Sequence, residues 1–368
     1  MARKRINYRV RSNGLLEHRF KYEGEWYSVY GFTVDECEQK KEKKKERLKA
    51  KLYTKNINIT LNAYYDEWQG QRNGVVTKST QYANDVKFKR IRESRLGKRK
   101  IIDIESREIK SFQQELARKV STSTVNDTIT LLKCILESAV EDRIISHNPC
   151  SSVKSLKRVE APATETIHRA LTEEETQLFF QYAKQTWYYL FFAFMVSTGC
   201  RVGEVSALTW RDIDYQAGMI HINKTVTRIS NTEYVVGEPK TRSSKRDIPL
   251  TDSIKSILTQ QKEVSRILNL DGRIFTSVSG GYVKKNSVNT CIKYILKQIE
   301  DETGEHIEPF STHAFRDTFA TRAIEQGMQP QTLKTILGHS SLSMTMDLYA
   351  HVMPNTKQEE MSKIYIAV

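Results

Sequence analysis

Cysteine is scarce in this chain, and proline is absent from its first 148 residues. The five cysteines are scattered and form no Cys-x-x-Cys pair, so we expect neither a disulfide framework nor a zinc site. The longest apolar run, Trp187 to Val196, has ten residues, which is too short to span a bilayer. Polar and basic residues follow the first methionine, so no secretory signal is predicted. These absences favour a cytoplasmic protein without a membrane segment.

Acidic residues are outnumbered: 58 Lys and Arg face 44 Asp and Glu, a net charge of +14. Residues 1–55 alone hold 16 basic and 8 acidic residues, so they carry +8 of that charge and the rest of the chain only +6. A basic extension on a milder body is typical of a protein that contacts DNA or RNA. A basic surface that serves only solubility is the alternative.

The N-terminal region alternates between apolar and charged residues. Residues 5–11 and 16–22 follow this period of two, and a third strand is predicted at 26–30 after a Gly-containing turn. The pattern predicts a small antiparallel sheet with a cationic face. A helix should follow from Thr33 to about Lys51, because Thr33 and Glu36 have the spacing of a capping box. We expect residues 1–55 to form a DNA-binding domain whose contacts come from Arg5, Arg9, Arg11, Arg19 and Lys21.

The next region, 56–155, is predicted to be an all-α domain. Its helices should span 61–71, 80–92, 106–119 and 124–143, the last with apolar residues at helical spacing. Asn148-Pro149 ends the pattern, and the segment from Cys150 to about Ile167 is typical of a linker between domains.

The third region, 165–368, is predicted to be mixed and mainly α (α+β), so the fold class is multidomain. Thr172 and Glu175 form a second capping box at its start. Helices are expected at about 173–185, 187–198, 203–210, 251–267, 285–301, 313–326, 330–337 and 343–350, and strands at about 218–223, 233–237 and 245–250.

Three residues of this region are suited to binding a phosphate. His313 and Arg316 begin a predicted helix, and their i, i+3 spacing puts both on one face at an end that favours anions. Arg201 follows an apolar helix in a Gly-x-Arg-x-Gly-Glu turn, where its fork can hold two oxygens of one phosphate. A surface arginine beside a capping histidine, and a structural salt bridge of Arg201, are the alternatives. Glu204 is expected to pair internally.

Lys240 is predicted to lie on a hairpin loop between strands around Val235 and Ile248. A flexible ammonium on such a loop can give a proton to a leaving oxygen. The alternative is a basic loop that only contacts phosphate, as is expected of its neighbours Lys245 and Arg246.

Two residues near the end complete the set. His339 lies in Leu337-Gly-His339, and taken alone it is a hydrogen-bonding core histidine. Tyr349 is one of 17 tyrosines. An ordinary tyrosine has a pKa of about 10 and is a poor nucleophile until cations and a base activate it.

Together these residues resemble the tyrosine recombinase (lambda-type integrase) family. Region 165–368 resembles its catalytic domain, the helical region its SAM-like core-site-binding domain, and the N-terminal sheet with its helix the arm-type DNA-binding domain of integrases of conjugative transposons and phages. Tyr349 comes ten residues after His339, where many relatives have nine, a variant that we associate with mobile elements. The matches, in the family's order, are Arg201 with its Gly-rich turn, Lys240, His313-x-x-Arg316, Leu337-Gly-His339 and Tyr349-x-His351.

The resemblance implies a site-specific recombinase that integrates and excises a mobile element through a 3′-phosphotyrosine intermediate, without metal, ATP or cofactor. The implied partners are double-stranded DNA with core and arm-type sites, a homotetramer on that DNA, and accessory excisionase and DNA-bending proteins. The implied roles are nucleophile for Tyr349, stabilisation of transition-state charge for Arg201 and Arg316, hydrogen-bond donor for His339, general base for His313 and general acid for Lys240.

Two other functions remain open at this point. A type IB topoisomerase or hairpin telomere resolvase shares the chemistry, but the N-terminal sheet and the spacing of the motifs argue against both. A non-enzymatic DNA-binding regulator should have lost a catalytic residue, and all six positions are filled. The tail, residues 355–368, ends in an apolar stretch at 364–368, which is expected to pack on its own chain or to dock on a neighbouring protomer; we favour the neighbour.

Overall fold

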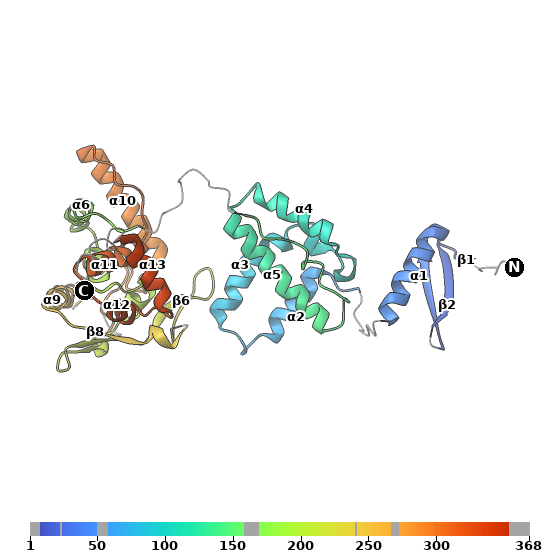
Figure 1. The fold of residues 1–368 in the computed structure, drawn as a ribbon, viewed down its shortest axis with the longest axis horizontal. Helices are drawn as coiled ribbons and strands as arrows, with labels where there is room; N and C mark the ends of the chain where they lie inside the picture. The colour runs from blue at the N-terminus through green and yellow to red at the C-terminus, as the bar shows by residue number, and fades with distance from the viewer. Residues whose placement is uncertain are drawn as a thin grey trace, which may run out of the picture. The chain divides into compact units, whose positions relative to one another are not determined.

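The computed structural model describes residues 8–22, 24–49, 58–157, 169–239, 241–265 and 272–352. The chain divides into two compact units, Met1–Ala161 and Pro162–Val368 (Figure 1). Arg5, Lys240 and the tail from residue 353 lie outside the described residues, and so do the predictions made for them. Among the described helices, none has the length and apolar character needed to cross a membrane.

The first unit begins with the predicted antiparallel sheet and helix. Strands β1 (Tyr8–Val10), β2 (Leu16–Tyr22) and β3 (Glu25–Gly31) lie in the order β1-β2-β3, and α1 (Val34–Lys49) follows. Phe20 and Val29 pack with Cys37 of α1 in a small core. The alternation of β2 therefore turns Arg19 and Lys21 to the face opposite α1.

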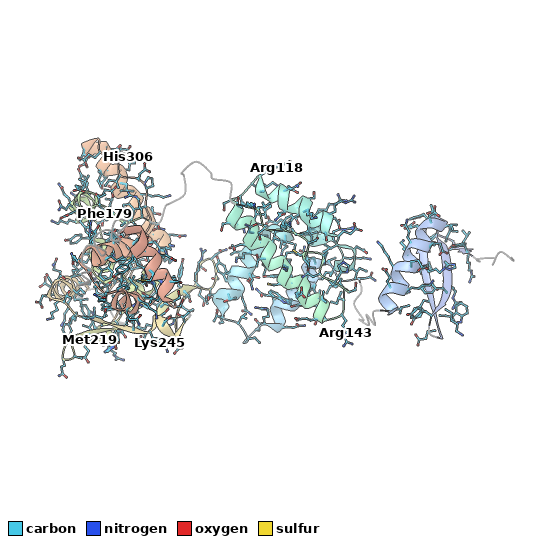
Figure 2. The ribbon with its side chains drawn as sticks, in the orientation of Figure 1. Arg118, Arg143, Phe179, Met219, Lys245 and His306 are labelled. Atoms are coloured by element: carbon cyan, nitrogen blue, oxygen red, sulfur yellow. The ribbon has the colours of Figure 1, made fainter. Side chains whose placement is uncertain are left out.

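Four helices make up the rest of this unit, with a separate core of their own. Side-chain hydroxyls at Thr60, Thr77 and Ser121 cap three of them by accepting a backbone N–H. Arg118 and Arg143 project from the surface of this bundle (Figure 2). The helices are α2 (Leu61–Gln71), α3 (Lys78–Arg92), α4 (Ser106–Ala117) and α5 (Thr122–Glu141).

The second unit is mainly helical, as predicted, and its core is rich in phenylalanine. Helix α7 is apolar on every side and is buried, with Phe192 against Phe179 of α6 (Figure 2). The predicted capping box is confirmed, because Thr172 and Glu175 each accept the other's backbone N–H. The helices are α6 (Glu173–Ala183), α7 (Tyr189–Thr198), α8 (Val202–Ala207), α9 (Asp252–Ser265), α10 (Lys285–Thr303), α11 (His313–Glu325), α12 (Pro330–Leu337) and α13 (Leu342–Val352).

The strands of this unit pair differently from the prediction. We expected the strands around Val235 and Ile248 to form one hairpin, and this is wrong. Strand β7 (Tyr234–Gly237) pairs with β6 (Thr225–Arg228), whereas β8 (Arg246–Pro249) pairs with β5 (Met219–Ile222) in a second sheet that also contains β4 (Ile213–Asp214). Neither β6 nor β4 was predicted, because β4 has two residues and β6 carries no apolar alternation.

Candidate active site

A glycine turn aims Arg201 out of the core. Helix α7 ends at Gly199, whose backbone is left-handed with φ +64°. A Cβ there would lie 2.7 Å from Phe319 and 2.8 Å from Leu337, so both the conformation and the space require glycine. Arg201 then precedes α8 as its N-cap. The Gly-rich turn found in the sequence is thus the structural device that presents this arginine.

Glu204 joins Arg201 to a second arginine. Arg201 donates to Glu204 through its backbone N–H and its guanidinium, at 2.9 Å each. Arg246 donates to the same carboxylate at 2.9 and 3.2 Å. Burial alone would raise the pKa of Glu204, but these hydrogen bonds and charges outweigh it and lower that pKa. The predicted internal pairing of Glu204 is confirmed.

Arg246 corrects a prediction. We expected it to be an exposed loop residue that contacts phosphate, yet its side chain is buried (7% exposed). Besides Glu204, its guanidinium donates to the carbonyls of Ile336 and Ser244 and to the sulfur of Cys200. It begins the edge strand β8, where the alternation of the strand turns its side chain inward, which a basic stretch of sequence does not reveal.

Arg316 is buried, and no carboxylate among the described residues pairs with it. From α11 it donates to the carbonyl of Gly199 at 2.8 Å and to that of Leu337 at 2.7 Å. Burial, and the charge of Arg201, lower the pKa of Arg316 to about 10. Three positive charges therefore lie around the Glu204 carboxylate, those of Arg201, Arg246 and Arg316. This excess of two positive charges favours a bound anion.

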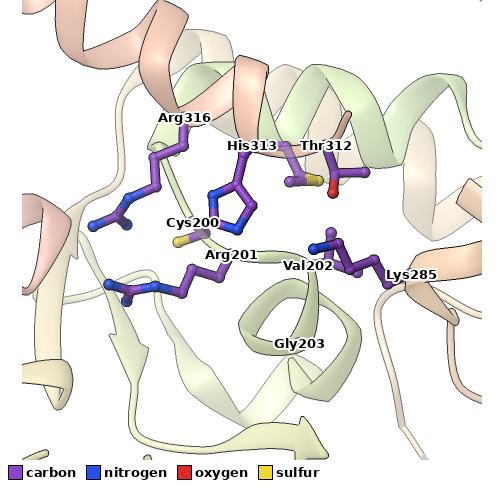
Figure 3. A pocket seen from close by; sticks show the side chains of 9 residues that line it. Cys200, Arg201, Val202, Gly203, Lys285, Thr312, His313 and Arg316 are labelled. Atoms are coloured by element: carbon purple, nitrogen blue, oxygen red, sulfur yellow. The ribbon is translucent and has the colours of Figure 1, made fainter. Parts of the chain in front are cut away.

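His313 and Arg316 share a pocket of about 120 Å³ with Arg201. Figure 3 shows the two residues descending from α11 while Arg201 reaches in from the turn before α8. Two further polar residues line the pocket, Lys285 at the start of α10 and Thr312 before α11. The i, i+3 argument therefore placed His313 and Arg316 together correctly.

His339 follows the left-handed Gly338 at the end of α12. Its Nδ1 lies 3.0 Å from the hydroxyl of Thr345, which is fully buried. Burial, and the charges of three neighbouring arginines, lower the pKa of His339 to about 4. The imidazole is therefore neutral near pH 7 and has a single N–H to donate.

A second pocket of about 330 Å³ adjoins the first through Arg201 and includes His339. Pro239 and Thr241, the neighbours of Lys240, also line it. Lys240 itself lies outside the described residues, but the loop that carries it borders the pocket. The hairpin predicted around this loop is wrong, and the role predicted for Lys240 stays a prediction.

Tyr349 is not brought into either pocket. Its ring packs against a buried cluster from α11 and α12, made of Ala320, Ala323, Ile324, Leu333 and Leu337, and its hydroxyl donates to the carbonyl of Met328. Burial raises the pKa of that hydroxyl, the opposite of what a nucleophile needs. In this conformation the tyrosine is held apart from the arginines.

The N-terminal sheet presents the cations that the alternation predicted. Arg11 lies over the ring of Tyr30, at 5.8 Å, and Arg19 over that of Trp26, at 5.6 Å. Trp26 is 61% exposed, so this face combines open aromatic rings with guanidinium groups. Arg11 also pairs with the buried Glu17 at 2.8 Å. The side chains of Arg9 and Lys21 are exposed.

Sequence reasoning missed three residues of the site: Arg246, Lys285 and Thr345. Lys285 begins one predicted helix and Thr345 lies within another, and nothing in the spacing links them to His313 or His339. Arg246 had one signal, the apolar Ile248 two residues later, because alternation along a strand puts both side chains on one face.

Comparison with known proteins agrees with this geometry. A model of the phage integrase family matches residues 169–356. The chain is 31% identical to the ICEBs1 integrase of Bacillus subtilis over 70% of both chains. It is 28% identical to a XerC-like tyrosine recombinase of Caldanaerobacter subterraneus subsp. tengcongensis over 89% of this chain and 88% of that one.

Two solved structures share the fold. The Tn1549 transposon integrase in complex with a circular intermediate DNA has a TM-score of 0.71 at 23% identity, covering 83% of this chain and 100% of that one. A lambda integrase dimer bound to a core site has a TM-score of 0.61 at 17% identity, covering 100% and 99%. With the family match over half of the chain, these findings establish that the chain belongs to the phage integrase family, the tyrosine recombinases of the lambda integrase type.

Proposed function

We propose that this chain is a site-specific DNA recombinase that integrates and excises a mobile genetic element through a 3′-phosphotyrosine intermediate. One observation carries the proposal: Arg201, His313 and Arg316 line one pocket, and His339 lines the pocket beside it. These residues come from separate segments of the chain and together form a cationic recess that fits a phosphodiester.

The two arginines hold the scissile phosphate and its transition-state charge. Since Arg316 has no carboxylate partner among the described residues, its charge is available to a phosphate oxygen. Neutral His339 donates its single N–H to another oxygen. Fixed donors of this kind cost no reorganisation during the reaction, which is why they stabilise a transition state strongly.

The phosphoryl group is then transferred from the 5′-oxygen of the DNA to the oxygen of Tyr349. The Tyr349 oxygen attacks phosphorus, the bond from phosphorus to the 5′-oxygen breaks, and the tyrosine proton passes to His313. Lys240 gives a proton to the departing 5′-oxygen. Reversal by a second 5′-hydroxyl restores the phosphodiester, because the phosphotyrosine bond conserves its energy. On this account neither metal nor ATP takes part.

Tyr349 has to move before it can attack. Its hydroxyl must leave the Met328 carbonyl and enter the recess beside the arginines. We infer that DNA binding, or a neighbouring protomer on the DNA, supplies the free energy for this movement of α13. The conformation described here is then an inactive one in which the nucleophile is withheld.

The remaining parts of the chain bind DNA. We propose three domains: 1–55 for arm-type sites, 56–155 for the core site and 165–368 for catalysis. The separate hydrophobic cores of the sheet with α1, of helices α2–α5 and of the second unit support this division. Two domains that bind separate sites would let one protomer bridge two DNA segments.

The proposed function also implies an oligomeric state and partner proteins. A lambda integrase tetramer bound to a Holliday junction is among the similar structures, with a TM-score of 0.59 at 19% identity, and we propose that this chain also acts as a tetramer on DNA. Excisionase and DNA-bending proteins would assist it in the cytoplasm.

Cleavage of a core site in EDTA without ATP tests the proposal. We expect a nicked core site to give a 3′-linked protein–DNA adduct that survives denaturation, and the adduct to religate when a 5′-hydroxyl strand is added. A requirement for a divalent metal, or a 5′ linkage, would contradict the proposal.

Deletion of residues 1–50 tests the division into domains. Binding to outlying arm sites should weaken while core-site cleavage is retained. Loss of core-site cleavage in that variant would contradict the modular arrangement.

A further inference from the structure

We propose that the pocket beside His313 is a second phosphate subsite, in which Lys285 and Thr312 bind a phosphate next to the scissile one on the cleaved strand. The inference rests on the proposed function, because it assumes that Arg201 and Arg316 hold the scissile phosphate. It adds two residues that no motif indicated.

Lys285 faces this pocket without a partner of its own. It is the first residue of α10 and is exposed, and its amine points into the pocket (Figure 3). Within the described parts of the chain, no carboxylate or carbonyl binds this ammonium. The adjacent Lys284 differs, because its amine lies over the ring of Tyr234 at 5.3 Å. Only the second of these consecutive lysines is thus directed at the site.

Thr312 supplies a buried hydroxyl that lacks a partner. The residue is 1% exposed, and its Oγ1 makes no hydrogen bond with any described residue. Its backbone is already engaged, since the Thr312 N–H donates to Oδ1 of Asn289 at 3.2 Å. Although Thr312 precedes α11 as its N-cap, its side chain makes no capping bond. Buried hydroxyls are rarely left unpaired, so this one is explained by an acceptor that arrives with the substrate.

The size and charge of the pocket identify that acceptor. Its volume of about 120 Å³ lies well below the roughly 300–1,000 Å³ of pockets for drug-sized molecules, and no acidic side chain is among its described lining residues. This basic lining favours a small anion. Because Arg201 and Arg316 also line the pocket, the phosphate that reaches Lys285 is a close neighbour of the one held by the arginines.

The subsite has a mechanistic consequence. Fixing two consecutive phosphates sets the direction of the strand as well as the position of the scissile bond. A strand held at one phosphate alone can pivot, and small misplacements of reacting atoms reduce rates strongly. Lys285 and Thr312 would therefore orient the phosphorus for in-line attack.

A neutral methylphosphonate at each phosphate flanking the scissile one provides the test. On normal DNA, Lys285→Ala should slow single-turnover cleavage about tenfold and reduce the salt slope of binding by about one, whereas Lys284→Ala should have little effect. At one of the two flanking positions the methylphosphonate should slow the wild type to the same degree and slow Lys285→Ala no further. The methylphosphonate at that position should likewise slow cleavage by Thr312→Val no further. Thr312→Ser keeps the hydroxyl and should cleave like the wild type.

Two results would overturn the subsite. One is that, at both flanking positions, the methylphosphonate slows cleavage by Lys285→Ala by the same factor as it slows cleavage by the wild type. The other is rescue of Lys285→Ala by a substrate with a 5′-bridging sulfur, which leaves without a proton and would make Lys285 the general acid. Failure of the proposed function looks different, since the wild type would then form no tyrosine-linked adduct on any of these substrates.

Discussion

The two halves of the active site differ in how far they are assembled. The arginine cluster (Arg201, Glu204, Arg246 and Arg316) is joined by hydrogen bonds within it and to the backbone carbonyls of Gly199 and Leu337. Tyr349 packs in a hydrophobic cluster with its hydroxyl on the Met328 carbonyl. On the proposed function, the fold thus prepares the charge that would bind a phosphate and withholds the group that would attack it. Such a division would prevent cleavage by a protomer that is not correctly bound.

The two halves are physically connected through α12. Arg316 donates to the carbonyl of Leu337, and Arg246 to that of Ile336. The side chain of Leu337 belongs to the hydrophobic cluster against which Tyr349 packs. Substitutions in either half test this difference, and the largest effect is expected in the arginine cluster.

Removal of Arg246 should damage the arginine cluster most. Arg246→Met leaves Glu204 buried with only the half-exposed Arg201 as a partner. Breaking one side of a buried ion pair costs about 3–5 kcal/mol, so the free energy of unfolding should fall by that amount in a denaturant titration of the catalytic unit. The double variant Arg246→Met with Glu204→Gln should recover part of the loss. If the single variant loses under 1 kcal/mol, the cluster is not held by this pair.

Removal of Arg316 should affect the reaction more than DNA binding. Loss of one transition-state donor typically costs about 10²–10³ in rate, so Arg316→Ala should slow single-turnover cleavage by that factor, with a smaller change in core-site affinity. Arg322→Ala is a matched control on the same helix, because Arg322 pairs with Glu325 at 2.7 Å. Equal losses in both variants would show that the effect is structural.

Replacement of Thr345 tests how His339 is oriented. Nδ1 of His339 and the buried hydroxyl lie 3.0 Å apart. On the proposed function the hydroxyl donates to Nδ1, which leaves the histidine proton on Nε2. Thr345→Val keeps the shape and should slow cleavage about tenfold, the effect of roughly one hydrogen bond, and should alter the ¹⁵N signature of the His339 tautomer. Thr345→Ser should behave as the wild type. Thr259→Val, on an exposed site of α9, is the control, and an unchanged tautomer in Thr345→Val would refute this orientation.

The pH dependence of stability should carry a small contribution from His339. Its pKa falls from 6.5 to about 4 on folding, so the unfolded chain binds more protons in this window. Stability from this source is complete above pH 6.5 and is lost as the pH falls toward 4. The free energy of unfolding is measured against pH for the wild type and for His339→Gln. The difference between the two curves should isolate the pH dependence that His339 contributes. A difference that rises as the pH falls would reverse the sign and contradict the buried, neutral histidine.

Sequence patterns predicted the parts of this molecule that depend on local periodicity. The N-terminal sheet, the helical bundle and most helices of the second unit follow from apolar spacing and capping residues such as Thr172 and Glu175. Pairing between distant strands did not follow, because β8 carries no local sign that it joins β5 rather than β7. For the same reason the buried role of Arg246 was missed.

The site was predictable as a set of residues but not as a conformation. Arg201, His313, Arg316 and His339 converge because glycine turns and helix ends fix their backbones. The position of Tyr349 depends on how its ring packs against the buried cluster of α11 and α12 and on its hydrogen bond to the Met328 carbonyl, and motif spacing contains no information about these contacts.

Mapping the covalent adduct is the most direct test of the account. The protein is trapped on a nicked core site, digested with protease, and the DNA-bearing peptide is sequenced by mass spectrometry. We expect the DNA to be attached to Tyr349. We expect Tyr349→Phe to form no adduct, although it should still bind the core site. An adduct formed by Tyr349→Phe, or DNA attached to Tyr365, would contradict the account.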